Sequence, residues 1–225
     1  MIIQDGFSLI KWAEDELAMT SVENPRSDAE SIFMHSFGMS REDVYLRKEF
    51  KPSDAQIKDF RKSVDLRATR YPLQYILKSV DFMGLRLSLE DGVFIPRVET
   101  ELLVEKTIGI INLLGKKRIN ILEIGVGCGN IAISLTKNIS GCKIIASDVS
   151  EKALKVATKN ISKHGVRNKI RLIKSNVFDK ISDVYYNYFD IILSNPPYVR
   201  RRDLKNLQPE VLRENRSSLD GGYDG

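Results

Sequence analysis

The feature that most constrains the fold is a glycine-rich turn between an apolar segment and a helical pattern. Residues 119–124 predict a buried strand, and a Gly-x-Gly-x-Gly turn follows at residues 125–129. Glycines permit positive φ and close approach of a ligand to the backbone, and the helix after the turn begins with unpaired N–H groups. A second strand is predicted at residues 142–147 and ends at Asp148, whose carboxylate can accept hydrogen bonds from a ribose. This order predicts a parallel α/β sheet that binds an adenosine-type cofactor.

The residues around the turn distinguish between classes of cofactor. Dinucleotide-binding proteins use Gly-x-Gly-x-x-Gly, and here Asn130 stands where their third glycine would fall. Glu123 precedes the turn, and its carboxylate would repel a pyrophosphate but suits a ligand that carries an ammonium group. S-adenosylmethionine has an ammonium group, a ribose and an adenine but no phosphate, so the residues favour it over NAD. A Walker-type phosphate loop is excluded because no Gly-Lys-Ser/Thr ends the turn.

A second candidate site follows another predicted strand, at residues 188–194. That strand runs into Asn195-Pro196-Pro197-Tyr198. The prolines end the strand and hold Asn195 extended at its carboxyl end. The Asn195 side-chain carbonyl and the Pro196 backbone carbonyl are two rigid acceptors that suit a substrate NH₂ group. For Asn-Pro alone a simple turn is the better interpretation, but the glycine-rich turn upstream favours a catalytic one.

Several motifs resemble those of one enzyme family. Residues 123–129 resemble motif I of class I methyltransferases, and residues 195–198 resemble their amino-methylating motif. Residues 94–101, Phe-Ile-Pro-Arg-Val-Glu-Thr-Glu, are similar to the Pro-Arg-Pro-Glu-Thr-Glu signature of HemK/PrmC-type enzymes. Those enzymes methylate the side-chain amide nitrogen (N5) of the glutamine in the Gly-Gly-Gln motif of bacterial peptide chain release factors. Residues 75–85 and 210–225 also match stretches of that family, and the first seventy residues match it only in helical character.

The resemblance, added to the reading of the residues, implies a set of site residues and no metal. Asn176 stands where the family commonly has Asp and could accept a hydrogen bond from an adenine amine, and Pro96 and Arg97 would lie near the methionine end of the cofactor. A salt bridge from Arg97 to Glu99 or Glu101 is the structural alternative. The expected cofactor-binding residues are Pro96, Arg97, Glu123, Gly125, Gly127, Gly129, Asp148, Asn176, Val177 and Asn195. The expected catalytic residues are Asn195, Pro196 and Tyr198, and the expected substrate-binding residues are Asn195, Pro196, Pro197 and Tyr198.

The expected architecture has three parts. Residues 1–70 are predicted to form an all-helical domain that binds release factors, residues 71–97 a β-hairpin linker, and residues 98–225 a Rossmann-like S-adenosylmethionine-dependent methyltransferase domain. Asp91-Gly92 is a strong hairpin-turn signal, and a helix is predicted to end at Gly115. A further strand is expected at residues 170–174.

The methyltransferase domain is expected to be incomplete. A class I domain normally continues into a helix and three more strands, so the sequence predicts that C-terminal strands are missing after Gly225. The apolar edge that this leaves would lower stability and favour association.

The composition and charge of the chain limit the classes of partner that we expect. The formal charge is +5, hydrophobic residues make up 42%, and no run of about twenty apolar residues occurs. The N-terminus lacks a signal peptide's basic start, and Cys128 and Cys142 lack metal-ligand spacing. We expect a cytoplasmic monomer that acts on release factors and binds neither membranes nor nucleic acid directly. Two alternatives stay open: a methyltransferase of nucleic-acid amines (adenine N6 or guanine N2), and a module that binds a partner without catalysis.

Overall fold

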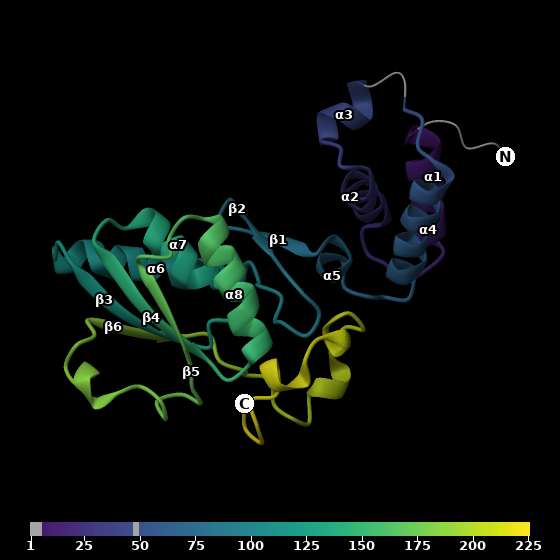
Figure 1. Ribbon diagram of the computed structural model, residues 1–225. Coiled ribbons are helices and arrows are strands. Elements are labelled where there is room, and N and C mark those ends of the chain that lie inside the picture. The colour runs from purple at the N-terminus through teal and green to yellow at the C-terminus, as the bar shows by residue number, and fades with distance from the viewer. Residues whose placement is uncertain (1–5, 47–49) are drawn as a thin grey trace. The chain divides into compact units, whose positions relative to one another are not determined.

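Helices form the first of two compact units in the computed structural model, which describes residues 6–46 and 50–225. This unit comprises residues up to Lys78 together with Gln208–Arg213, and the second comprises Ser79–Leu207 and Glu214–Gly225. The helices of the first unit are α1 (Gly6–Ala18), α2 (Pro25–Phe37), α3 (Arg41–Leu46), α4 (Asp54–Ala68) and α5 (Leu73–Leu77), all labelled in Figure 1. Phe33 and Phe60 are fully buried at its centre. Helix α4 begins with a capping box in which Ser53 and Gln56 satisfy each other's backbone amides.

The first unit extends past the expected boundary at residue 70. Helix α5 belongs to it because Ile76 is buried in the same hydrophobic core as Phe33 and Phe60. The short segment Gln208–Arg213 also belongs to it, although the chain on both sides of that segment lies in the second unit. The unit is therefore discontinuous in sequence.

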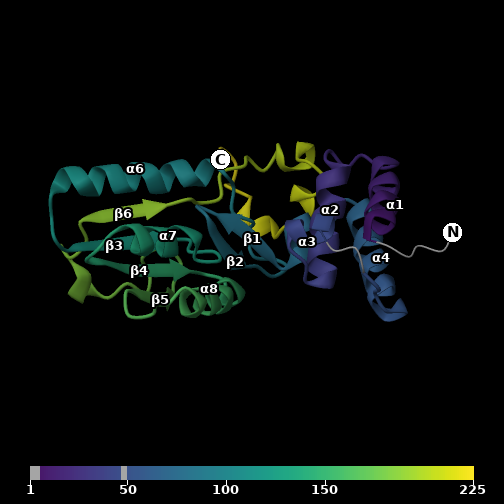
Figure 2. The ribbon, with the colours of Figure 1, turned by 90° about the horizontal axis from the view of Figure 1, so that it is seen from above.

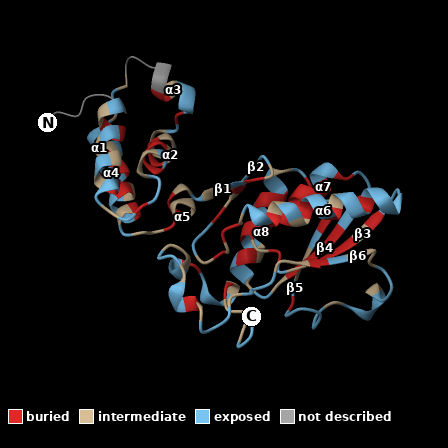
Figure 3. Ribbon diagram, turned by 180° about the vertical axis from the view of Figure 1, so that it is seen from behind, coloured by how far each residue is buried: buried red, intermediate tan, exposed pale blue. Residues whose placement is uncertain are grey.

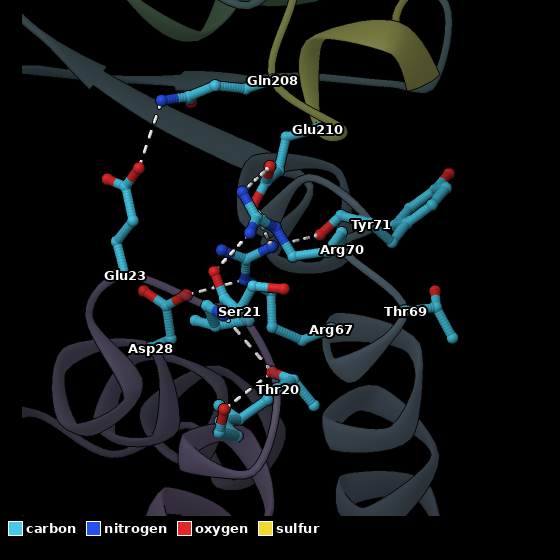
Figure 4. A network of polar contacts seen from close by, with 12 residues as sticks. Thr20, Ser21, Glu23, Asp28, Arg67, Thr69, Arg70, Tyr71, Gln208 and Glu210 are labelled. Carbon is cyan, nitrogen blue, oxygen red and sulfur yellow. Dashed lines mark hydrogen bonds and ion pairs between the residues drawn. The ribbon is translucent and has the colours of Figure 1, made fainter.

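A network of charged side chains fixes the segment 208–213 to the helices of the first unit (Figure 4). Arg67 Nε donates to Asp28 Oδ2 at 2.7 Å, and Arg67 Nη1 donates to Glu210 Oε1 at 2.9 Å. Arg70 binds both oxygens of Glu210, from Nε at 2.6 Å and from Nη2 at 2.5 Å. A two-pronged contact of this kind fixes geometry as well as charge. The segment is thus held by a carboxylate that two arginines share.

The second unit opens with an antiparallel hairpin of β1 (Ser79–Phe82) and β2 (Leu85–Ser88). Its two-residue turn is Met83-Gly84, with φ of 49° and 71°. The prediction of a hairpin turn at Asp91-Gly92 was wrong: that turn follows β2, and the described residues after it form no strand that pairs with β2. Both turns place a glycine at positive φ, so the glycine signal alone did not distinguish them.

A parallel sheet is the centre of the second unit. Its order is β5-β4-β3-β6, with β3 at Ile119–Ile124, β4 at Cys142–Asp148, β5 at Ile170–Lys174 and β6 at Ile191–Ser194. Three of these strands begin where the sequence predicts, and β6 begins three residues later than the predicted residue 188. The rings of Tyr185, Tyr188 and Phe189 pack on one another before β6 starts.

Three helices accompany the sheet. They are α6 (Glu99–Leu114), α7 (Asn130–Asn138) and α8 (Glu151–Lys163); α6 and α7 are neighbours, and in the view of Figure 2 α6 runs along the side of the sheet where β6 lies. Buried residues gather in β3 and β4 and along α7 (Figure 3), and every residue from Asn130 to Thr136 is buried. The core therefore lies beneath the turn that joins β3 to α7. Within the ranges 6–46 and 50–225, none of the helices has the length and apolar character needed to cross a membrane.

Candidate active site

A cavity of about 330 Å³ opens where the parallel strands end, within the second unit. Residues from six stretches of chain form its wall: the loop 92–94, the glycine-rich turn with the start of α7, the stretch after β4, the stretch after β5, the segment 194–199, and the segment 215–219. Nine of the residues predicted from the sequence lie on this wall, namely Gly125, Gly127, Asp148, Asn176, Val177, Asn195, Pro196, Pro197 and Tyr198. The structure thus brings the glycine-rich turn and the Asn-Pro-Pro-Tyr segment together at one cavity.

Backbone hydrogen bonds hold the glycine-rich turn in place. The amides of Gly125 and Val126 both donate to the carbonyl oxygen of Ser147, at 2.8 and 2.9 Å. Gly125 and Gly127 have φ of 81° and 54°, values that residues with a side chain rarely adopt. The amide of Gly127 donates to Asp148 Oδ2 at 2.9 Å. Asp148 therefore fixes the turn and, with lone pairs to spare, can still accept from a ribose hydroxyl at the cavity wall.

Gly129 lies behind the wall and serves packing. It precedes α7 with φ of 89°, and a Cβ there would lie 3.2 Å from Ile133 Cδ1 and 3.6 Å from Ala157 Cβ. Its lack of a side chain lets the start of α7 approach α8. Gly125 and Gly127 line the cavity, whereas Gly129 does not.

Glu123 also lies behind the wall, although the sequence places it among the cofactor-binding residues. Glu123 is only 1% exposed, and neither of its carboxylate oxygens has a hydrogen-bond partner among the residues that the structure describes. Burial raises the pKa of the Glu123 carboxyl well above its usual range, and the charge of Asp148 adds to this. The backbone amide of Ala132 acts in the opposite direction without reaching hydrogen-bond geometry. Because the Glu123 side chain is buried behind the wall, it does not present a charge to a ligand in the cavity as the sequence argument expects.

Asn195 lies on the wall directly after β6. Its side-chain Nδ2 donates to Thr100 Oγ1 at 3.1 Å, across 95 residues of sequence. The hydroxyl of Ser194 donates to the carbonyl oxygen of Ile124 at 2.8 Å, which joins the ends of β6 and β3. Asn195 is therefore held through its side chain and through the residue before it.

Pro96 and Arg97 do not line the cavity. Pro96 is buried, and Arg97 forms an ion pair with Glu214 rather than with the expected alternatives, Glu99 or Glu101. The other oxygen of Glu214 accepts from the backbone amide of Ile95 at 3.2 Å. The loop 92–94 and the segment 215–219 both form cavity wall. The contacts of Glu214 with Ile95 and Arg97 therefore connect two sides of the cavity through residues that directly adjoin the wall.

The Asn-Pro-Pro-Tyr segment continues into a short pairing with the end of the chain. The amide of Val199 donates to Leu219, and the amide of Gly221 donates to the carbonyl oxygen of Val199, at 3.0 and 2.9 Å. A Cβ on Gly221 would lie 2.9 Å from both Pro197 O and Tyr198 Cα. Tyr198 itself stays 62% exposed, with its ring available to a substrate.

Sequence reasoning assigned no role at the site to Thr100, Glu214 or Gly221. All three lie in stretches that the family resemblance covers, so their place in those motifs was the available signal. Their partners are between 22 and 119 residues away in the chain, and spacing alone cannot reveal such contacts.

The chemistry of the wall fits a cofactor without phosphate. Among the described residues that line it there is no Lys or Arg, and Asp148 supplies the one carboxylate. A pyrophosphate would lack compensating positive charge there, whereas a cationic ligand with a ribose and an adenine meets suitable acceptors. Over the described part of the chain, no group of three or more His, Cys, Asp or Glu could hold a metal ion.

A Rossmann-like sheet, a glycine-rich turn and an Asn-Pro-Pro-Tyr segment at one cavity define an enzyme of the methyltransferase class. Models of two protein families match the chain: the PrmC N-terminal domain over residues 8–77 and the methyltransferase small domain over residues 100–222.

Curated relatives narrow the class to a family. The release factor glutamine methyltransferase of Geobacter sulfurreducens is 35% identical over 96% of this chain and 74% of that protein. The protein of the same name from Dictyoglomus turgidum is 35% identical over 96% of this chain and 75% of its own length. The one from Chlorobaculum tepidum is 33% identical over 91% and 71%. The chain belongs to the release factor glutamine methyltransferase family.

Proposed function

We propose that this protein methylates the side-chain amide nitrogen of the glutamine in the Gly-Gly-Gln motif of peptide chain release factors, with S-adenosylmethionine as methyl donor. One observation carries the proposal: Asn195-Pro196-Pro197-Tyr198 shares a cavity wall with Gly125, Gly127 and Asp148. Acceptors suited to an NH₂ group thus adjoin elements suited to an adenosine-type cofactor. The proposed substrate, a glutamine of a release factor, follows from the names of the relatives.

The cofactor assignment depends on the wall's composition. Asp148 is assigned to the ribose, Asn176 and Val177 to the adenine, and Gly125 and Gly127 to close contact along the turn. Pro96, Arg97, Gly129 and Glu123 are assigned to supporting this wall from behind, because none of them lines the cavity. S-adenosylmethionine supplies a methyl group on a sulfonium, which is an electrophile that needs no further activation.

The protein's task is then to orient a weak nucleophile. A glutamine amide nitrogen attacks poorly because its lone pair is delocalised into the carbonyl. The Asn195 side-chain oxygen and the Pro196 carbonyl would accept its two N–H groups and direct the lone pair toward the methyl carbon. Such positioning can supply about 7–11 kcal/mol in the best oriented cases.

The charge balance needs no catalytic base. The nitrogen–methyl bond forms as the sulfur–methyl bond breaks, and positive charge appears on the nitrogen. The hydrogen bonds from the nitrogen to the two acceptor oxygens strengthen as this charge develops. The nitrogen then loses one proton to water, since a protonated amide nitrogen is very acidic. Tyr198 would pack against the glutamine side chain from the exposed side of the cavity.

The helical first unit is proposed to dock the release factor. The PrmC N-terminal domain model covers residues 8–77 and supports this role. We also propose that the protein is a monomer. We propose a cytoplasmic location because release factors act in translation.

The test is methyl transfer from labelled S-adenosylmethionine to unmodified release factor, with the label mapped by mass spectrometry. The expected product carries one methyl group on the Gly-Gly-Gln glutamine, and a release factor with Gly-Gly-Ala in that motif should remain unlabelled. Transfer to bare RNA or DNA without transfer to release factor would instead assign the chain to nucleic-acid amines.

A further inference from the structure

Thr100, in the second unit, contacts Asn195 without lining the cavity itself. It lies in the first turn of α6, is only 7% exposed, and accepts a hydrogen bond from Asn195 Nδ2 at 3.1 Å. Its hydroxyl therefore lies behind Asn195, on the side away from any bound substrate. Among the described residues, no other hydrogen bond to the Asn195 side chain accompanies this one.

The two ends of a carboxamide have opposite chemistry. One end donates two hydrogens and the other accepts. The terminal torsion of Asn is broad and roughly two-fold, so the side chain alone does not choose which end faces a ligand. If the NH₂ end faced the cavity, it would oppose the NH₂ group of a substrate, donor against donor. A hydroxyl can pair with either end of an amide; in the structure Thr100 Oγ1 accepts from Nδ2, which leaves the side-chain oxygen for the cavity.

We propose that Thr100 is a positioning residue that binds the NH₂ end of Asn195, so that the side-chain oxygen faces the substrate amine. The inference rests on the proposed function only for the identity of that amine. Thr100 and Asn195 come from stretches 95 residues apart, and Ser194 and the two prolines hold the backbone of Asn195 while Thr100 fixes its side chain. Thr100 is itself buried in the first turn of α6, and this burial restricts the positions that its hydroxyl can take.

Two substitutions separate the hydroxyl from the volume of the side chain. Thr100→Val removes the hydroxyl and keeps the branched shape, and Thr100→Ser keeps the hydroxyl. We expect Thr100→Val to lower kcat about tenfold or more and Thr100→Ser to stay within about threefold of wild type. The dissociation constant for S-adenosylmethionine, measured by titration calorimetry, should remain unchanged in both variants.

The matched control is Thr107→Val. Thr107 lies on the same helix, is also buried, and donates to the carbonyl oxygen of Leu103 at 2.7 Å. The same loss of a hydroxyl there should leave kcat unchanged. A comparable fall in kcat for Thr107→Val would attribute the effect of Thr100→Val to disruption of α6 and overturn the proposal.

A double-mutant cycle gives the sharpest result. If Thr100 acts through Asn195, adding Thr100→Val to Asn195→Ala should cause no further loss of kcat. An equal loss in both backgrounds would show that Thr100 acts independently of Asn195. The cycle uses whichever amine substrate the wild-type protein methylates, so a wrong release-factor assignment would appear in the wild-type assay and leave the test of Thr100 intact.

Discussion

Asn195 is the residue on which methyl transfer should depend most. Its replacement by Ala removes a side-chain acceptor at the cavity wall and leaves Asp148 and the glycine-rich turn in place. We expect Asn195→Ala to lower kcat by a factor on the order of 10² to 10³, as for the loss of one oriented group at a developing charge. The dissociation constant for S-adenosylmethionine should change little. Steady-state kinetics and titration calorimetry on the same preparations check both, and turnover equal to wild type would remove Asn195 from the mechanism.

Glu123 should make stability depend on pH. Burial raises its pKa in the folded protein above that of the unfolded chain, so the unfolded chain loses its proton first as pH rises. The contribution of Glu123 to stability is therefore complete below the unfolded pKa, about 4.3, and falls as pH rises toward the folded value. Glu123→Gln removes this titration. We expect the variant to gain stability relative to wild type as the pH rises above about 5, as measured by urea unfolding.

Individual site residues could be predicted from the sequence where they belong to a local motif. They could not be predicted where their place depends on a partner far away in the chain. The places of Asn195, Gly125 and Asp148 on the cavity wall were predictable because each directly follows a predicted strand, and parallel strands end at the same edge of the sheet. The partner of Arg97 was not, because Glu214 lies 117 residues away and competes with nearer acids. Glu123 shows a different limit: its position before the turn was clear, but its burial depends on the packing of α7 over β3.

Among the segments that build the site, the chain after the Asn-Pro-Pro-Tyr motif depends on Gly221. A methyl group there would lie 2.9 Å from Pro197 O and Tyr198 Cα, which are backbone atoms and cannot rotate away. We expect Gly221→Ala to displace the motif and lower kcat at least tenfold, with a loss of stability of about 1–3 kcal/mol. Methyl-transfer kinetics and urea unfolding measure the two effects.

The control for Gly221 is Gly109→Ala on α6. Gly109 lies within the helix, has no atom within 4 Å of the position of an added Cβ, and has no positive φ. The same substitution there should stabilise the protein by about 0.4–1 kcal/mol and leave kcat unchanged. Wild-type activity in Gly221→Ala would show that the contact with the motif can relax without consequence.

The hairpin shows why element boundaries were only partly predictable. Met83 takes a φ of 49°, which the sequence gives no reason to expect of a methionine. Its backbone amide donates to Glu101 Oε1 at 2.7 Å, so a carboxylate from α6 supports the turn. Asn160 on α8 also binds both backbone groups of Ser88, at 2.7 and 2.9 Å. Strand β2 thus depends on two helices that follow it, whereas β3, β4 and β5 follow from their own apolar runs.

Across the whole chain, the sequence pattern indicates a helical region followed by a parallel sheet, but it does not indicate that α5 and Gln208–Arg213 belong to the first unit. The helical region and the parallel sheet each have a continuous pattern of apolar residues. Gln208–Arg213 has no such pattern, and it joins the first unit through Glu210. The ion pairs of Glu210 with Arg67 and Arg70 span 143 and 140 residues. Sequence spacing offers no signal for contacts of that range.

Glu210 is therefore expected to stabilise the first unit. Burial raises the pKa of the Glu210 carboxyl, but hydrogen bonds from Arg70, from its own backbone and from Arg67 outweigh this and lower it overall. Glu210→Gln keeps the shape and removes the charge. Arg67 would retain Asp28 as a partner, and Arg70, with a φ of 64°, would lose its two-pronged contact. We expect a loss of about 1–3 kcal/mol in the free energy of unfolding at neutral pH.

The pH dependence of this loss identifies its cause. The folded pKa of Glu210 lies below that of the unfolded chain, so its stabilisation is present above the unfolded pKa and disappears as pH falls through the folded value. Wild type and Glu210→Gln should therefore converge in stability as the pH falls below about 4. Asp15→Asn is the control, because the Lys11–Asp15 pair joins exposed side chains at 2.8 Å and should contribute almost nothing. A difference between wild type and Glu210→Gln that stayed constant with pH would show that packing of the segment, and not its charge, holds it to the helices.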